Sequence, residues 1–442
     1  MGAHRNSPKQ KSTTLKFLLD LDLRQDSSRQ KHSNPEHDEI LSVISYCSYT
    51  YTFTDPLESP SQQNHKCDSL LKLLSIIKLQ KKPFPNDILL PLFAMISTNL
   101  FRPLPPPNTS IVSILPDDDD LVTTPTAAWP HLHIVYDILL RLVISVEEKV
   151  LREYINDSFI LNLLALFESL DPRERDSLKI VYHKVYLRLH ASRSFMRKAM
   201  NDVFLYYIFE TDKKHCGIGD LLEIWGTIIN GFSIPLKEEH KIFMMRVLIP
   251  LHRPKGMQAY HKQLAYCVYQ FLEKEPKLGF VVVRGILRYW PMTNCQKEVL
   301  LIGELEELVE NMGTEQYKIL ALPLCRQIIK CLNSWNSQVA ERALYVWNNE
   351  RFVKMALEAV DDVFPIIVEG MEKNLKWHWS ESVRQLTENV KEMLEKMEPI
   401  LYSKCLSQLD HHDSATNEEE VRRKERWQRV EMAAKMNQLG QE

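Results

Sequence analysis

A short charged segment, Lys237-Glu238-Glu239-His240, carries residue types that could do chemistry. Within a helix, Lys237 and His240 stand three positions apart and share one face. Such a pair could serve acid–base catalysis, or it could bind an anionic group. Because the sequence places no nucleophile nearby, a charged binding surface is favoured over a catalytic pocket.

Catalytic motifs are absent from the rest of the chain. The sequence contains no GxxxxGK[ST] phosphate loop and no GxGxxG, HExxH or GxSxG motif. Its 15 histidines are scattered, and its eight cysteines form no CxxC pair or zinc-like spacing. We therefore predict no catalytic residue, no metal site and no cofactor.

The segment before the charged cluster predicts a helix followed by a turn. Its apolar residues recur at the helical spacing of about 3.6 residues and would line one face. They are Ile218, Leu221, Leu222, Ile224, Trp225, Ile228, Ile229 and Phe232. Gly231 and Pro235 end this face, and the charged cluster opens the next helix. The pattern is typical of one unit in an array of helix pairs.

A second predicted helix, over 177–200, is strongly basic. Its basic residues are His183, Lys184, Arg188, Arg193, Arg197 and Lys198. If this helix stacks beside 217–232 and 237–250, a groove with cationic walls and aliphatic pockets from Ile224 and Ile228 results. Such a groove suits an extended peptide with spaced aliphatic and acidic or phosphorylated residues. A basic solvent-facing surface over an ordinary core is the alternative that periodicity leaves open.

The composition favours helices joined by short turns. Only 12 of 442 residues are glycine, well below the usual share of about 7%. The net charge of -3 gives no general attraction to nucleic acid or anionic lipid. No apolar run is long enough to span a bilayer. The cysteine pattern and the lack of a signal peptide predict a reducing, intracellular setting.

The chain divides into three predicted regions. Residues 1–38 are polar and predicted to be disordered, and 406–442 form a charged tail with an exposed helix. Between them, 39–405 is predicted to be a HEAT- or armadillo-like α-solenoid, with helix pairs every ~40–47 residues. A Pro- and Asp-rich surface loop covers 102–126. Asp171-Pro172-Arg173-Glu174 predicts a helix start, with an N-cap aspartate and proline at the first position.

Several long segments resemble the B-prime regulatory subunits of protein phosphatase type 2A. The strongest are DPRERDSLKIVYHKVY (171–186), FETDKKHCGIGDLLEIWGTIINGFSIPLKEEHKIF (209–243), HKQLAYCVYQFLEKEP (261–276) and QVAERALYVWNNE (338–350). FRPLPPP (101–107), AAWPHL (127–132) and RYWPMTNCQKEVLLIGELEEL (288–308) also match. The resemblance covers about 80–405, and two of the blocks are closest to plant members.

The resemblance implies a non-catalytic HEAT-like solenoid that joins a scaffold A subunit and a catalytic C subunit. It also implies a groove that recruits substrates bearing an LxxIxE motif. The corresponding groove positions here are His183, Lys184, Tyr186, Arg193, Ile224, Ile228, Lys237 and His240. By this resemblance, the two isoleucines would hold the motif's isoleucine, and His183 and Lys184 would engage its glutamate. Arg193, Lys237 and His240 would read acidic or phosphorylated residues.

The chain departs from the family at one of these positions. The family pattern HRIYGKF is HKVYLRL here, so Lys184 replaces an arginine and a point charge replaces a two-pronged donor. One residue is also inserted near 213–215.

Three alternative functions stay open. A helical-repeat scaffold or transport adaptor without a phosphatase is the first, and an all-helical enzyme is the second. A nucleic-acid-reading solenoid is the third, although basic residues do not recur once per helix pair. We expect a cytoplasmic protein and leave the nucleus open as a second compartment. The basic cluster that could act as a nuclear address comprises Arg422, Arg423, Lys424, Arg426 and Arg429.

Overall fold

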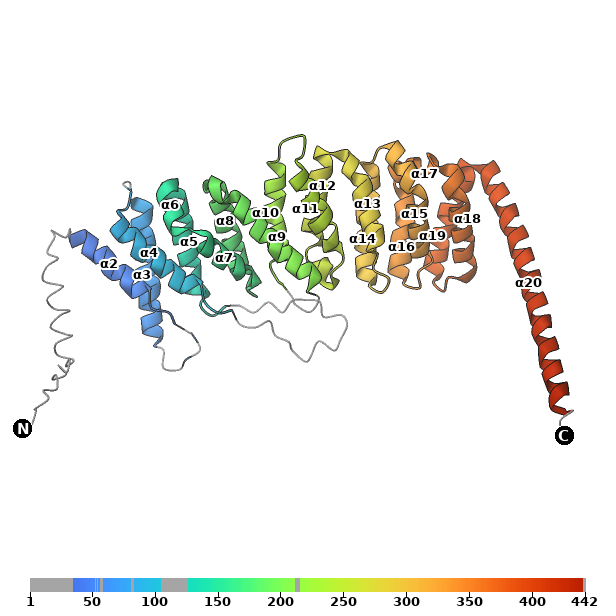
Figure 1. Cartoon of the computed structure of the whole chain (residues 1–442), viewed down its shortest axis with the longest axis horizontal. Helices are drawn as coiled ribbons and strands as arrows, with labels where there is room; N and C mark the ends of the chain where they lie inside the picture. The colour runs from blue at the N-terminus through green and yellow to red at the C-terminus, as the bar shows by residue number, and fades with distance from the viewer. Residues whose placement is uncertain are drawn as a thin grey trace, which may run out of the picture. The chain divides into compact units, whose positions relative to one another are not determined.

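A computed structural model of the chain shows an all-α protein (Figure 1). The structure describes residues 35–51, 53, 55, 59–80, 83–104, 126–210 and 215–439. These ranges contain helices, turns and short irregular connections, and none of them contains a strand. The all-α prediction is confirmed. Residues 1–34 of the predicted disordered segment and 105–125 of the predicted surface loop lie outside the described residues.

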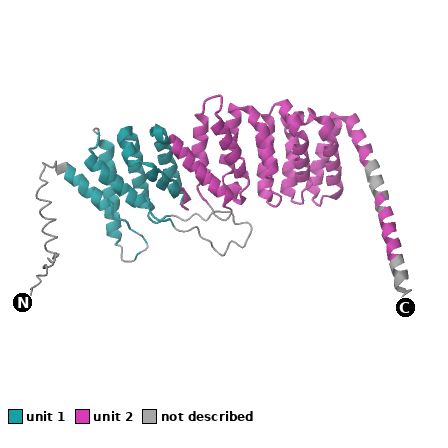
Figure 2. Cartoon of the chain, viewed as in Figure 1, with its two compact units in different colours: residues 1–104, 124–166, 171–192 teal, residues 105–123, 167–170, 193–442 magenta. Residues whose placement is uncertain are grey.

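The chain forms two compact units (Figure 2). The first contains residues 1–104, 124–166 and 171–192, and the second contains 105–123, 167–170 and 193–442. The described helices of the first unit are α2 (Pro35–Cys47), α3 (Pro60–Leu79), α4 (Asn86–Leu100), α5 (Trp129–Ser145), α6 (Glu148–Tyr154), α7 (Asp157–Ala165) and α8 (Pro172–Arg188). Helix α5 packs between α3 and α8, so the three helices form one row of the unit.

The second unit contains most of the remaining helices. They are α9 (Arg193–Phe209), α10 (Ile218–Asn230), α11 (Glu238–Phe243), α12 (His261–Lys274), α13 (Gly279–Arg288), α14 (Cys295–Glu310), α15 (Thr314–Leu332), α16 (Ser337–Tyr345), α17 (Glu350–Leu357), α18 (Val360–Trp377), α19 (Glu381–Met397) and α20 (Pro399–Leu439). Short 3-10 segments and one π-helix, Met244–Leu248, connect some of them.

The later helices of the second unit stack in two layers (Figure 1). Helices α13, α15 and α18 pack in succession in one layer, and α14, α16 and α19 pack in succession in the other. Side-chain hydrogen bonds also connect equivalent positions of neighbouring helix pairs. Asn374 Nδ2 donates to the carbonyl oxygen of Leu332, 42 residues earlier, and Trp379 Nε1 donates to Trp335 O, 44 residues earlier. This repeat of stacked antiparallel helix pairs confirms the predicted solenoid class.

The scarce glycines include one that allows two stacked helices to approach closely. A Cβ atom added to Gly370 in α18 would lie 2.2 Å from Ile329 Cγ2 in α15. The adjacent Asn333 donates from Nδ2 to Gly370 O at 3.0 Å. A larger residue at 370 would therefore require Ile329 or the helices themselves to shift.

The C-terminal helix α20 is 41 residues long. Near its start, Tyr402 and Cys405 are only 1% and 3% exposed, because this part packs on α18 and α19. The described side chains from 421 to 432 are all exposed. Burial of the first turns therefore anchors a helix whose later part has a solvated, charged surface.

Candidate functional site

The predicted site residues of the first unit lie on α8. Asp171 caps this helix as the sequence predicts: its Oδ1 accepts from the backbone N–H of Arg173 at 3.0 Å, and Pro172 takes the first helical position. His183 and Lys184 are both partly exposed, whereas Tyr186 is only 7% exposed. Burial, followed by the charge of Lys184, lowers the pKa of His183, which favours its neutral form.

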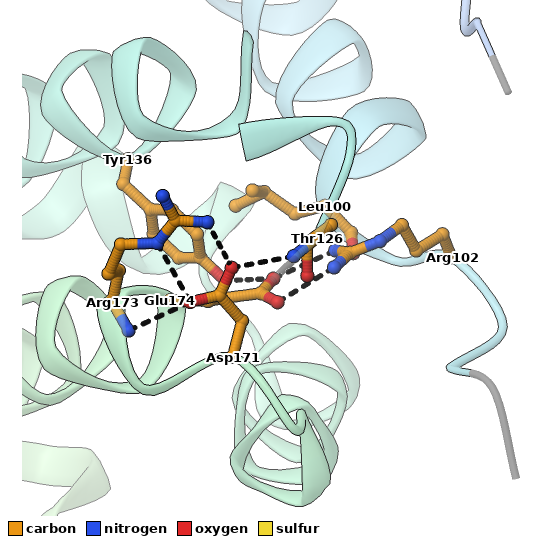
Figure 3. Close-up of polar contacts among 7 residues, drawn as sticks. All are labelled: Leu100, Arg102, Thr126, Tyr136, Asp171, Arg173 and Glu174. Carbon is orange, nitrogen blue, oxygen red and sulfur yellow. Dashed lines mark hydrogen bonds and ion pairs between the residues drawn. The ribbon is translucent and has the colours of Figure 1, made fainter. Parts of the chain in front are cut away.

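A buried ion pair fixes the first turn of α8 (Figure 3). The guanidinium of Arg102 donates to both carboxylate oxygens of Glu174, from Nη1 to Oε1 at 2.8 Å and from Nη2 to Oε2 at 2.7 Å. The hydroxyl of Tyr136 also donates to Glu174 Oε1 at 3.1 Å. The Glu174 side chain has no exposed surface, so this two-pronged pairing offsets the cost of burying its charge.

A second carboxylate, Asp171, joins the same helix start to the chain before α5. Its Oδ2 accepts from the backbone N–H of Thr126 at 2.7 Å and from Arg173 Nη2 at 2.8 Å. Burial alone would raise the pKa of Asp171, but these hydrogen bonds outweigh it and lower the pKa. The position of α8, and thus of His183 and Lys184, is set by charged groups that are buried and paired.

The sequence predicted one basic helix over 177–200, and this prediction is wrong. Helix α8 ends at Arg188, a 3-10 turn covers His190–Ser192, and α9 starts at Arg193. Leu189 leaves the helical conformation at φ -90° and ψ 79° while its side chain stays buried. Ser192 is of a residue type that competes for backbone hydrogen bonds and favours helix starts. The basic residues are consequently divided between two helices, with Arg193 and Arg197 on α9.

In the second unit, Ile224 and Ile228 lie one turn apart on α10, as predicted. They are 2% and 6% exposed, so most of each side chain belongs to the packed face of the helix. Their neighbour Trp225 stacks on Phe243 of α11, with ring centroids 3.9 Å apart. The stack joins the aliphatic face of α10 to the helix that contains His240.

The turn after α10 brings an aromatic ring onto His240. Phe232 and His240 stack face to face, with centroids 3.6 Å apart and ring planes within 3°. Lys274 of α12 holds this turn by donating from Nζ to Asn230 O and Phe232 O, each at 3.1 Å. Lys237 takes the N-cap position of α11, and its side chain is exposed. The structure therefore brings Lys237 and His240 together beside a tethered aromatic residue.

His240 is a buried ring in a mixed electrostatic environment. The residue is 9% exposed, its Nδ1 has no hydrogen-bond partner among the described residues, and its Nε2 lies 3.5 Å from Glu239 Oε1. Burial is the main cause of its lowered pKa, and the charges of Arg197 and Lys237 lower it further against an opposing effect of Glu239. In the absence of a ligand, this environment favours the neutral form of the imidazole.

Two contributors to this site were missed by the site prediction. Arg197 was noted only as part of a basic helix, yet its charge acts on His240. Phe232 was assigned to the apolar face of its helix, but the chain turns after Gly231 and aims it at His240. Spacing alone could not find these contacts, because they depend on how α9 and the turn are placed in three dimensions.

The described part of the chain lacks both a metal-binding cluster and a membrane-spanning helix. No group of three or more His, Cys, Asp or Glu side chains there could hold a metal ion. Nor does any helix within those residues have the length and apolarity to cross a membrane.

The fold is that of a helical-repeat protein whose α10 buries its aliphatic face and whose Arg197 and Lys237 lie near His240. Its sequence matches the model of the family described as "Protein phosphatase 2A regulatory B subunit (B56 family)" over residues 25–434. The chain belongs to this family.

The chain is also similar to plant regulatory subunits of serine/threonine protein phosphatase 2A. It is 43% identical over 400 residues to the 57 kDa B' beta isoform of Arabidopsis thaliana, covering 89% of this chain and 80% of the relative. The 57 kDa B' alpha isoform of Arabidopsis thaliana is 42% identical with the same coverage of both chains. The 57 kDa B' kappa isoform of Oryza sativa is 40% identical, with 89% and 78% covered.

Proposed function

We propose that this chain is a non-catalytic regulatory subunit of a heterotrimeric serine/threonine protein phosphatase. It binds a scaffold A subunit and a catalytic C subunit, and it recruits phosphoprotein substrates through short LxxIxE-like motifs. The observation that carries the motif proposal is the pair of cations, Arg197 and Lys237, near His240. The helix of His240 is joined through aromatic stacking to the helix of Ile224 and Ile228. Family membership supports the assembly with a phosphatase core.

The mechanism is an increase in effective concentration. Binding one short motif holds the rest of a flexible substrate near the catalytic subunit, so dephosphorylation of nearby sites becomes effectively intramolecular. Acidic or phosphorylated residues next to the motif meet the cationic side chains and tighten the complex. Because these charges are partly solvated, added salt weakens this contribution.

Fluorescence anisotropy with a labelled LxxIxE peptide tests motif recruitment. We expect the wild-type chain to bind and the His183→Ala/Arg193→Glu double variant to lose at least about tenfold in affinity. Lys330→Glu, which reverses one exposed charge on α15, is the matched control and should bind as the wild type does. Equal affinity of the wild type and the double variant would refute the groove.

Co-purification with the A and C subunits tests the assembly. A regulatory subunit should form a stable ternary complex and show no phosphatase turnover without the catalytic chain. A scaffold or transport adaptor would recover neither subunit. Turnover by the isolated chain would favour the other alternative, an all-helical enzyme.

A further inference from the structure

We propose that His240 takes up one proton when an acidic ligand side chain binds beside Arg197 and Lys237, and that Phe232 is the positioning residue that sets this coupling. The inference rests on the proposed peptide-binding function and adds a pH response to it. Three observations carry it: the ring stack, the lack of a partner for His240 Nδ1 among the described residues, and the two neighbouring cations.

The ligand-free environment disfavours a charged His240. A protonated ring has two N–H donors, but no described residue offers an acceptor to Nδ1. A positive charge on this ring would also stand near the charges of Arg197 and Lys237. Burial, the largest cause, lowers the pKa of the ring in the same direction.

An acidic ligand supplies what this environment lacks. Its carboxylate brings a negative charge that offsets the two cations, and this charge favours an imidazolium over a neutral imidazole. The ligand carboxylate stays ionised, so the proton comes from solvent and is bound by the imidazole. By linkage, a ligand that favours the protonated ring binds more tightly as the pH falls.

The other charged groups near His240 are one solvated carboxylate and groups that already have partners. Glu239, its sequence neighbour, is 3.5 Å from Nε2, and its side chain is 60% exposed. On the α12 side, Lys274 donates to backbone carbonyl oxygens, and Glu275 is paired with Lys241 at 3.1 Å. The main new charge near His240 in the complex is therefore the negative charge of the ligand.

Phe232 is suited to a positioning role. Its ring lies flat on the imidazole, so it limits the rotation of His240 and excludes water from one ring face. The same face is attractive to a cation once the imidazole is protonated. The two hydrogen bonds from Lys274, and an edge contact with Phe271 at 6.2 Å between centroids, keep Phe232 in place.

The test measures the affinity of the full chain for an LxxIxE peptide followed by aspartates, between about pH 8 and about pH 6. Aspartates are used because a phosphoryl group would itself titrate in this range. All variants are made in a His183→Gln background, which removes the other histidine of the proposed groove. We expect affinity to rise about three- to tenfold as the pH falls, with proton uptake shown by calorimetry in buffers of different ionisation heat.

The variants distinguish a loss of proton uptake on binding from a general loss of folding. His240→Gln should bind with little pH dependence, whereas His133→Gln, at an exposed position of α5, should keep the full dependence. Phe232→Leu should lose at least half of the proton uptake, and Phe232→Tyr, which keeps the ring, should restore it. A histidine-selective NMR titration should show the protonation midpoint of His240 moving up when the peptide is added.

Each outcome has a separate meaning. Binding without proton uptake, or an unchanged pH dependence in His240→Gln, overturns the proton coupling and leaves the proposed function standing. Full coupling in Phe232→Leu overturns the positioning role. Absence of peptide binding by the wild-type chain at every pH overturns the proposed function and this inference together.

Discussion

Two regions of this chain hold buried or half-buried charges in opposite ways. Around Glu174, the carboxylate accepts from Arg102 and Tyr136, and the arginine uses two nitrogens to do so. Around His240, a ring that is 9% exposed has two cations nearby and one nitrogen that no described residue partners. The first arrangement is complete without a ligand and stabilises the fold. The second leaves one buried nitrogen without a partner among the described residues, and by our proposal it becomes favourable when an anion binds.

The largest expected effect comes from breaking the complete network. Glu174→Ala leaves the guanidinium of Arg102 without its carboxylate in a largely buried setting. We expect the free energy of unfolding to fall by about 3 to 5 kcal/mol, measured by urea denaturation. Glu174→Gln keeps the size and some hydrogen bonds, so it should cost less. A loss under about 1 kcal/mol in Glu174→Ala would show that the network is not a main support of α8.

A second complete network, in the other unit, should make stability depend on pH. Glu304 accepts from the fully buried His252 at 3.1 Å and from His261 at 2.8 Å. His252 Nδ1 lies 2.9 Å from Ile249 O, an atom that can only accept, so both ring nitrogens face acceptors. Burial opposes charge on both partners, but their mutual attraction lowers the pKa of Glu304 to about 2 and raises the pKa of His252.

Because folding raises the pKa of His252, the pair stabilises the protein less as the pH rises. Its stabilisation is fully present below the pKa of an unfolded histidine, about 6.5, and is lost as the pH rises through the folded value. Glu304→Gln should lower the free energy of unfolding by about 2 to 4 kcal/mol near pH 6 and flatten this dependence. Denaturation curves across the pH range give both quantities. The same pH dependence in wild type and Glu304→Gln would contradict the assignment.

In the region around His240, a substitution should change peptide binding more than it changes the free energy of unfolding. Lys237 is exposed, so Lys237→Glu should change the free energy of unfolding by less than about 0.5 kcal/mol. Its affinity for an acidic LxxIxE peptide should nevertheless fall by about tenfold, because attraction becomes repulsion. Anisotropy and denaturation on the same preparation test the comparison. A large loss of stability with unchanged binding would reverse the roles assigned to the two regions.

The smallest expected effect concerns Lys184 on α8. Lys184→Arg restores the two-pronged donor expected from the family pattern, and the position is only partly exposed. We expect a several-fold gain in affinity for the glutamate-containing motif, equivalent to about 1 kcal/mol, with no change in pH response. Lys198→Arg, at an exposed position of α9, is the matched control. Equal gains in both variants would mean that Lys184 is not a specific contact.

The sequence anticipated features that depend on neighbours along the chain. The start of α8 was predicted from Asp171 and Pro172, and the cap is present as expected. Glu174 was recognised as part of that start, but its main partner is Arg102, 72 residues earlier. The continuous helix over 177–200 was wrong, because apolar spacing does not register the break at Leu189 and Ser192. The groove set that includes His183 and Tyr186 stays a prediction.

Local chemistry explains what the sequence by itself determined: an all-α chain of stacked helix pairs, with few glycines and an amphipathic α10. Helical periodicity and capping depend on residues a few positions apart, so they can be read directly. Tertiary structure alone decided which charged groups are paired across long stretches of sequence. The pairing of Glu174 with Arg102, and the stacking of Phe232 on His240, depend on turns and packing that bring distant side chains within a few ångströms.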